Sequence, residues 1–251
     1  MQRSDRERQA YETHDALQGR PWVHRVFAHI FQGPNAQHGE DLFFQSVAQR
    51  AAGGRSLELG CGSGGFAERL IYETDAAILA TDISTRQIDQ AKLKAVEGRL
   101  EFRELNAEDS VDGHYDLIYG RGVLHHIDFR SALERLANDN LNEGGAMVFR
   151  EPLGANVMGA VYRLLSKDDH TEDERPISRD DLGWFKRTFK GFWFYPYGLA
   201  SLPLGAVSSS TFRNANNPLT RLGHRLDDGV LRHIGPIQPL FRAAVLVIDP
   251  S

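Results

Sequence analysis

The sequence predicts an α/β fold in which helices cover both faces of a parallel sheet. Short apolar segments alternate with amphipathic segments from Arg55 onward, and a glycine-rich turn follows the first apolar segment. The length of 251 residues suffices for one such domain with a full core. Strands separated by helices of this length form a parallel sheet with right-handed crossovers. Ligands of such sheets bind at the carboxyl ends of the strands.

Residues 1–54 are expected to form a helical lead-in. Apolar side chains recur at helical spacing over 22–30 and again over 42–47. The segment 32–35 contains glycine and proline and therefore predicts a loop between two helices.

Residues 55–151 are expected to form the ligand-binding core. The apolar pattern predicts strands at 56–59, 76–81, 100–105, 115–119 and 146–150. Helices are predicted at 65–72, 84–97 and 129–141, and Ser84 or Thr85 is available to cap the second of them.

The rest of the chain alternates less regularly. A helix is predicted at 179–190, and strands are predicted at 192–195 and 242–248. The stretches 152–178 and 196–240 are interpreted as insertions that cap the strand ends and shape a substrate pocket. We expect the chain 1–251 to be a single domain.

The segment 58–65, Glu-Leu-Gly-Cys-Gly-Ser-Gly-Gly, is the strongest ligand signal. A glycine-rich turn from a strand into a helix lets the backbone approach a ligand, and the helix start presents free N–H groups. Asp82 ends the second strand, where an acid accepts hydrogen bonds from ribose hydroxyls. Because Gly60, Gly62 and Gly65 also satisfy the dinucleotide pattern G-x-G-x-x-G, an NAD(P)-dependent oxidoreductase is the alternative.

The same segment resembles the first motif of class I S-adenosylmethionine (SAM)-dependent methyltransferases, E/D-x-G-x-G-x-G. Two later segments are also similar to that family: 106–109, Asn-Ala-Glu-Asp, and 115–126, a strand followed by a short loop and Leu-His-His. The resemblance covers about 55–151. It implies a Rossmann-like, doubly wound sheet of seven strands, mostly parallel with the last strand antiparallel.

The resemblance also implies SAM as cofactor. The residues expected to bind it are Glu58, Gly60, Cys61, Gly62, Gly64, Asp82, Ile83, Asn106, Ala107, Gly120 and Arg121. An acid before the glycines suits a ligand that carries an ammonium and a sulfonium, and would face a pyrophosphate badly. Asn106 departs from the aspartate common in the family, but its side-chain oxygen can still accept a hydrogen bond from an adenine amino group.

Methyl transfer requires alignment of the reacting groups and, for a hydroxyl acceptor, benefits from a base. His125 is the first candidate, because imidazole titrates near neutral pH and the family's loop passes the methyl group at this point. Glu151, at the end of the fifth strand, is the second candidate, as a base or as an orienting carboxylate. The alternatives are a structural role for the His125-His126 pair and a solvated acid at 151. Arg121 could instead bind an acidic substrate group.

We expect an enzyme that methylates a small molecule in a biosynthetic pathway. A hydroxyl oxygen is the favoured acceptor atom, and nitrogen and carbon stay open. The uncharged, aromatic-rich stretch 191–212 indicates either an acceptor with an apolar portion or the core of an insertion. A non-catalytic protein with the same fold is a further alternative, from a different functional class.

Composition limits the partners. The net charge of −5 argues against nucleic-acid binding, which needs a basic face. A single cysteine excludes an intramolecular disulfide, and the first residues lack an apolar signal segment, so we expect a cytoplasmic protein. Prolines and glycines interrupt 191–212, so no membrane span is predicted. The acidic stretch 168–176 is interpreted as a solvated loop; no metal site is predicted, and a homodimer is left open.

Overall fold

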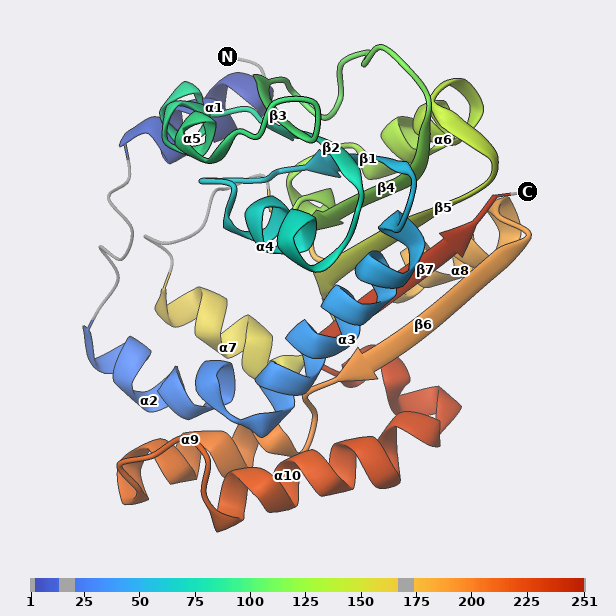
Figure 1. The fold of residues 1–251 in the computed structure, drawn as a ribbon. Coiled ribbons are helices and arrows are strands. Elements are labelled where there is room, and N and C mark those ends of the chain that lie inside the picture. The colour runs from blue at the N-terminus through green and yellow to red at the C-terminus, as the bar shows by residue number, and fades with distance from the viewer. Residues whose placement is uncertain (1–2, 14–20, 167–173, 251) are drawn as a thin grey trace.

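The structure is a computed structural model that describes residues 3–13, 21–166 and 174–250. Its centre is a seven-stranded sheet of order β3-β2-β1-β4-β5-β7-β6 (Figure 1). The strands are β1(Arg55–Leu59), β2(Ala77–Asp82), β3(Leu100–Glu104), β4(Tyr115–Arg121), β5(Leu141–Pro152), β6(Gly191–Tyr197) and β7(Ala243–Asp249). β7 runs antiparallel to both of its neighbours, whereas the other described strands share one direction. The predicted fold class is therefore confirmed.

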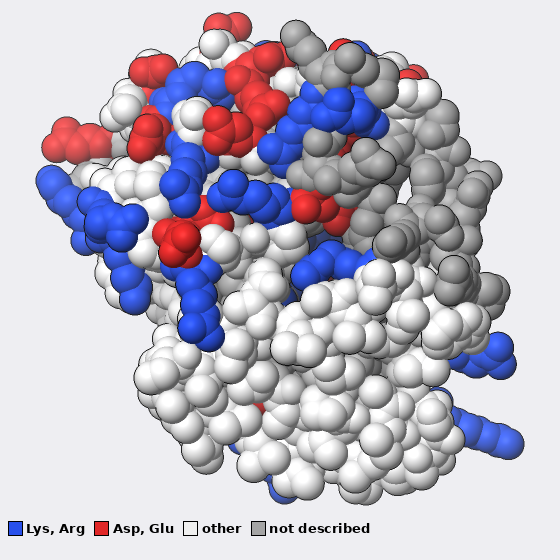
Figure 2. Space-filling model, turned by 180° about the vertical axis from the view of Figure 1, so that it is seen from behind, with Lys and Arg blue, Asp and Glu red and all other residues white. Residues whose placement is uncertain are grey.

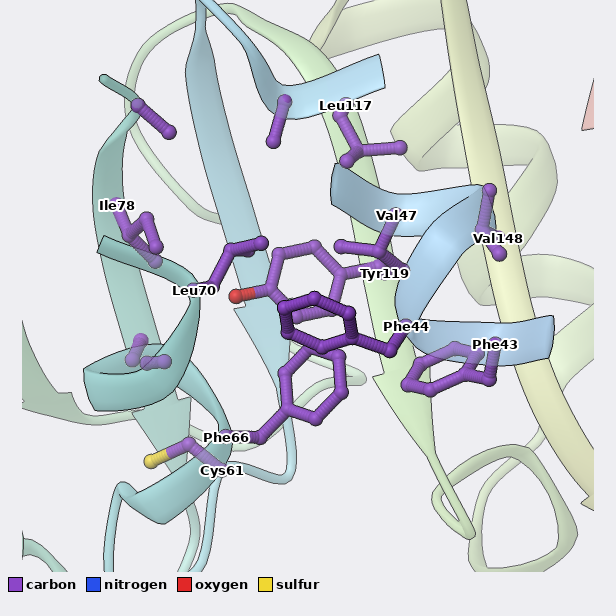
Figure 3. Close-up of a cluster of buried hydrophobic side chains, with 14 of the residues drawn as sticks. Phe43, Phe44, Val47, Cys61, Phe66, Leu70, Ile78, Leu117, Tyr119 and Val148 are labelled. Carbon is purple, nitrogen blue, oxygen red and sulfur yellow. The ribbon is translucent and has the colours of Figure 1, made fainter. Parts of the chain in front are cut away.

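Helices cover both faces of the sheet. On one face lie α3(Pro34–Ala51), α4(Gly65–Glu73) and α5(Thr85–Ala91), and on the other lie α6(Phe129–Asp139) and α8(Arg179–Thr188). Figure 3 shows the first of these cores, where aromatic rings of α3 and α4 converge on β4. The ring centroid of Phe66 lies 5.1 Å from that of Phe43 and 5.6 Å from that of Tyr119. Because both faces are covered, the central strands are almost continuously buried, and in β1 this includes the polar Ser56 and Glu58.

A cap of helices lies beyond the carboxyl end of β6 (Figure 1). It consists of α2(Pro21–Gln32), α7(Val157–Leu165), α9(Ser201–Thr211) and α10(Pro218–Gly229), and the first three share a small apolar core. Asp227 of α10 fixes the chain after β6, because its carboxylate accepts the backbone N–H groups of Leu199, Ala200 and Ser201. α1(Arg3–Thr13) lies apart from the cap, beside β3.

Several predicted element boundaries were wrong. The helix expected over 84–97 ends at Ala91 and is followed by a 3-10 turn, Lys92–Lys94, because the chain must reverse for Val96 to pair with Leu100. The loop expected over 32–35 is a single break at Gly33, since Pro34 suits the first position of α3.

Other boundaries moved by a few residues. The strand expected at 146–150 extends over Leu141–Pro152, and the helices expected at 129–141 and 179–190 end earlier, at Asp139 and Thr188. Ser84 is the cap of α5, as one of the two predicted alternatives, and its hydroxyl accepts the N–H of Gln87.

The uncharged stretch 191–212 divides between a strand, β6, and an eleven-residue helix, α9. No helix in the described part of the chain has the length and apolar character needed to cross a membrane.

Candidate active site

A cavity of about 230 Å³ lies at the carboxyl ends of the central strands, and we call it the loop cavity because the glycine loop forms one of its walls. Most residues predicted to bind a cofactor line it, namely Gly60, Gly62, Asp82, Ile83, Asn106, Ala107 and Arg121. Four others, Glu58, Cys61, Gly64 and Gly120, do not line it. The predicted set thus divides into residues at the cavity and residues behind it.

The glycines of the loop are needed for two different reasons, a positive φ and a lack of space for a Cβ. Gly60, Gly62 and Gly64 all have positive φ, at 67°, 53° and 79°, which strongly favours glycine. A Cβ on Gly64 would lie 2.6 Å from the ring of Phe102, whereas one on Gly62 would meet nothing within 4 Å.

Gly65 differs from these three, because its φ is ordinary and a Cβ there would also meet open space. In a dinucleotide-binding turn the third glycine of G-x-G-x-x-G is needed for close packing of the helix on the strand. The loop therefore requires Gly60, Gly62 and Gly64, but it does not require Gly65, the third glycine of the dinucleotide pattern.

Glu58 lies beneath the loop and is 3% exposed. Its carboxylate accepts the hydroxyl hydrogen of Tyr119, at 3.3 Å. Burial raises the pKa of Glu58 to about 7, against the opposing influence of Arg121. This acid is paired with Tyr119 inside the core and does not line the loop cavity.

Asp82 is the acid that faces the cavity. One of its oxygens accepts the N–H of Gly62 at 2.8 Å, and the other accepts the N–H of Ser84 at 2.9 Å. Burial raises the pKa of Asp82, and these backbone N–H groups oppose the rise. Each carboxylate oxygen keeps a second lone pair for a ligand hydroxyl.

Asn106 also faces the cavity, and its side-chain oxygen accepts the N–H of Glu108 at 3.1 Å, closing a local turn. Cys61 is buried, and burial raises the pKa of its thiol, so it has no nucleophilic character.

The first helix contributes residues that the sequence did not single out. Ser4 and Glu7 of α1 line the loop cavity together with His126. The carboxylate of Glu7 lies 3.1 Å from Nδ1 of His126, and both side chains are largely buried. No sequence pattern marked Glu7, because α1 is polar throughout and its contact with His126 bridges more than a hundred residues.

A second cavity of about 220 Å³ adjoins the first, and we call it the aromatic cavity. Gly122, which follows β4, lines both cavities. The rings of Phe27 and Phe31 from α2 lie 5.1 and 5.2 Å from that of Tyr162 on α7, and all three line the aromatic cavity. Both predicted catalytic residues, His125 and Glu151, line it as well.

His125 and Glu151 form a hydrogen-bonded pair. Nδ1 of His125 lies 2.7 Å from Oε2 of Glu151, and Oε1 of Glu151 accepts the N–H groups of Val123 and Leu124 at 2.9 Å each. A carboxylate only accepts hydrogen bonds, so Nδ1 is assigned as the donor, and in the neutral ring Nε2 keeps a free lone pair. Glu151 is 1% exposed, which excludes the alternative of a solvated acid.

Arg121 lies at the edge of the loop cavity, and its guanidinium is 3.4 Å from a carboxylate oxygen of Glu40 on α3. The acidic stretch 168–176 falls largely outside the described residues. Among the residues that the structure describes, no group of three or more His, Cys, Asp or Glu side chains could hold a metal ion.

Comparison with known proteins places this geometry in a family. The family model described as a methyltransferase domain matches residues 27–189, more than half of the chain. The chain is also similar to a ubiquinone biosynthesis O-methyltransferase of Nitrosococcus oceani, with 30% identity over 132 residues. That alignment covers 47% of this chain and 56% of the relative, so the chain spans little more than half of the relative's length.

Solved structures share the fold over the whole chain. A geranyl diphosphate C-methyltransferase from Streptomyces coelicolor matches with a TM-score of 0.61 and 11% identity, covering 100% of this chain and 99% of that one. An N-methyltransferase from Bradyrhizobium japonicum matches with a TM-score of 0.59 and 14% identity, covering 100% of both chains. At these identities the likeness shows the fold alone.

Proposed function

The chain belongs to the methyltransferase-domain family, and we propose that it transfers the methyl group of SAM to a hydroxyl oxygen of a small, partly apolar molecule. The observation that carries this proposal is the meeting of the two cavities at Gly122. One cavity has the walls of a cofactor site, and the other holds a histidine with a free lone pair among aromatic rings.

The loop cavity suits an adenosyl ligand. Gly62 leaves open space where a side chain would stand, and Asp82 offers lone pairs to ribose hydroxyls. Asn106 and Ala107 lie where the family's adenine-binding segment falls. When bound, SAM supplies a methyl group activated by a sulfonium.

His125 is proposed as the base. Its Nε2 takes the proton of the acceptor hydroxyl as the oxygen attacks, a contribution of about 10²- to 10⁴-fold in rate. Glu151 is proposed as a positioning residue, because it holds Nδ1–H and two backbone N–H groups and thereby fixes the ring and its tautomer.

Oxygen is favoured as the acceptor atom on two grounds. A hydroxyl benefits from a base during attack, and the presence of His125 on the cavity wall supports this choice. The relative from Nitrosococcus oceani is named as an O-methyltransferase. The C- and N-methyltransferases of the same fold illustrate that the fold alone does not choose the atom.

The first test is calorimetric titration with SAM, S-adenosylhomocysteine (SAH) and NADH separately. We expect binding of the two adenosyl ligands in the micromolar range and none of NADH. Binding of NADH alone would overturn the proposal and make the glycine loop a pyrophosphate site.

The second test uses two substitutions in an assay for methyl transfer to a panel of phenolic acceptors. His125→Gln is expected to lower kcat by about 10²-fold or more with the SAM affinity unchanged. Glu151→Gln should shift the pH profile of kcat while leaving part of the activity. Full activity of His125→Gln would remove His125 as the base, and cofactor binding without turnover on any acceptor would favour a non-catalytic protein.

A further inference from the structure

Three arginines gather around Glu40 near the aromatic cavity, and two of them pair with its carboxylate. Glu40 of α3 lies 2.6 Å from Arg150 through one oxygen and 3.4 Å from Arg121 through the other. Arg242, the residue before β7, interacts electrostatically with both Glu40 and Arg150. Three positive charges and one negative charge leave this group with a formal charge of +2.

Arg242 is the member of the group without an ion pair. Its guanidinium lies 5.4 Å from the ring centroid of Phe31 and 5.3 Å from that of Tyr197. Within the described part of the chain the guanidinium has no hydrogen-bond or ion-pair partner. Its backbone is firmly held: the N–H donates to Gly198 and the carbonyl accepts from Leu153, at 2.7 and 2.9 Å.

This arrangement leaves strong donors unsatisfied. A guanidinium carries five N–H donors. Contacts with aromatic faces attract its charge but do not replace hydrogen bonds to these donors. Burial lowers the pKa of Arg242, which reflects the cost of keeping the charge away from water. Arg242 is partly buried, and a charge of this kind is stabilised when an opposite charge enters beside it.

Two other charged groups of the cavity wall already have close partners. Glu151 is engaged by His125 and by two backbone N–H groups, and Arg150 pairs with Glu40. Arg163 lines the cavity too, and the charge of Glu174 opposes its own. Arg242 differs from Arg163 because it lies near two aromatic rings and within a group of net positive charge, so Arg242 is the residue that we expect to meet an incoming anion.

The rest of the cavity wall is apolar. The rings of Phe27, Phe31 and Tyr162 form one side, and His125 lies on the wall beside Gly122. Figure 2 shows a similar contrast on one face of the molecule, where charged side chains gather in the upper half and the lower half is almost uncharged apart from basic side chains at its edges. A ligand that fits this cavity has an apolar body and one negatively charged group.

Resting on the proposed function, we propose that Arg242 binds an anionic oxygen group, a carboxylate or a phosphate, on the methyl acceptor. The planar guanidinium matches both groups through paired N–H donors. The enzyme would thus select apolar hydroxy acids, or phosphate-bearing alcohols, over neutral alcohols of the same shape.

The test measures binding to the SAH-saturated full chain by calorimetry, so that it does not depend on turnover. The probes are 4-hydroxyphenylacetate, 4-hydroxybenzylphosphonate and the neutral 4-(2-hydroxyethyl)phenol. We expect at least one anionic probe to bind about tenfold or more tightly than the neutral one. The difference in affinity between anionic and neutral probes should shrink at high salt. The anionic probe that binds more tightly shows whether the site prefers a carboxylate or a phosphate-like group.

Arg242→Gln is expected to abolish this preference while the neutral probe and SAH bind as before. Arg242→Lys should keep part of it. The matched control is Arg225→Gln on α10, which removes an exposed arginine outside the cavity and should leave the preference intact.

Equal binding of all three probes, or undetectable binding of all three, overturns the role of Arg242 while SAH binding still supports the proposed function. Loss of the preference in Arg225→Gln as well would also overturn it, because a general charge effect would then suffice. Failure of SAH to bind would instead count against the proposed function itself.

Discussion

Asp82 joins the glycine loop to the loop cavity, because the same carboxylate accepts the N–H of Gly62 and lines the cavity. Asp82→Asn is expected to weaken SAH binding by about 1–3 kcal/mol, through a lost charge and a lost hydrogen-bond acceptor. Calorimetric titration measures this change. Asp89→Asn on the exposed surface of α5 is the control, and an unchanged affinity in Asp82→Asn would contradict its assignment to the cofactor.

Glu58 gives the fold a pH dependence. Its pKa rises on folding from 4.5 to about 7, so the folded chain holds a proton that the unfolded chain has released between these values. Stability is therefore expected to fall as the pH rises through this window, by up to about 3 kcal/mol, and to level off on either side.

Urea denaturation of the wild type and of Glu58→Gln across pH 4.5 to 8 tests this expectation. The substitution should remove the slope that Glu58 contributes, and histidines titrate alike in both proteins. Parallel stability curves for the two proteins would show that Glu58 does not titrate in this window.

The sequence located both acids, but it could not assign their different roles. The acid before the glycines was expected to face the cofactor, since the motif places it at the loop. The direction of a side chain at a strand end depends on its partners, and Tyr119, 61 residues away, holds Glu58 beneath the loop. The sequence singled out both His125 and Glu151, but it could not predict that they form a pair, because the two residues are 26 positions apart in the chain.

At the scale of the elements, the turn from β1 into α4 depends on particular glycines. Gly64→Ala is expected to destabilise the fold by about 2–4 kcal/mol, because the new Cβ meets Phe102 and the backbone has φ of 79°. Gly65→Ala should change the stability by less than about 1 kcal/mol, since its Cβ would enter open space. Chemical denaturation compares the two, and an equal loss in both would refute this account of the turn.

The regular elements of the core were predictable because local patterns specify them. Each strand from β1 to β4 was expected within about two residues, as both faces of the sheet demand apolar side chains. The cap was not predictable in this way. α9 contains Pro203 and Gly205 in its sequence and was interpreted as an insertion, yet Gly205 allows the helix to pack on Ile30 of α2.

At the scale of the whole molecule, both cavities lie at the carboxyl ends of the strands, the aromatic cavity between the core and the cap and the loop cavity between the core and α1. The fold was predicted from the alternation of strands and helices, and the family from three segments of the core, 58–65, 106–109 and 115–126; both predictions were confirmed. The walls of the aromatic cavity come from α2, α7 and the residue before β7, whose sequences carry no common pattern. The acceptor and a homodimer therefore stay predictions.

α1 lies far along the chain from the other walls of the loop cavity, so we expect cofactor binding to affect distant parts of the chain. SAH at 100 times its dissociation constant should stabilise the fold by about 2.7 kcal/mol, which raises Tm by about 5–10 °C for a domain of this size. Amide hydrogen exchange should slow in the glycine loop, at 82–87 and 105–108, and also in α1, because Ser4 and Glu7 line the loop cavity. The hollow at the amino ends of the strands, lined by Arg55 and 95–102, should be unchanged. Protection confined to that hollow would place the cofactor elsewhere, and protection of the loop without α1 would show that the first helix plays no part in holding it.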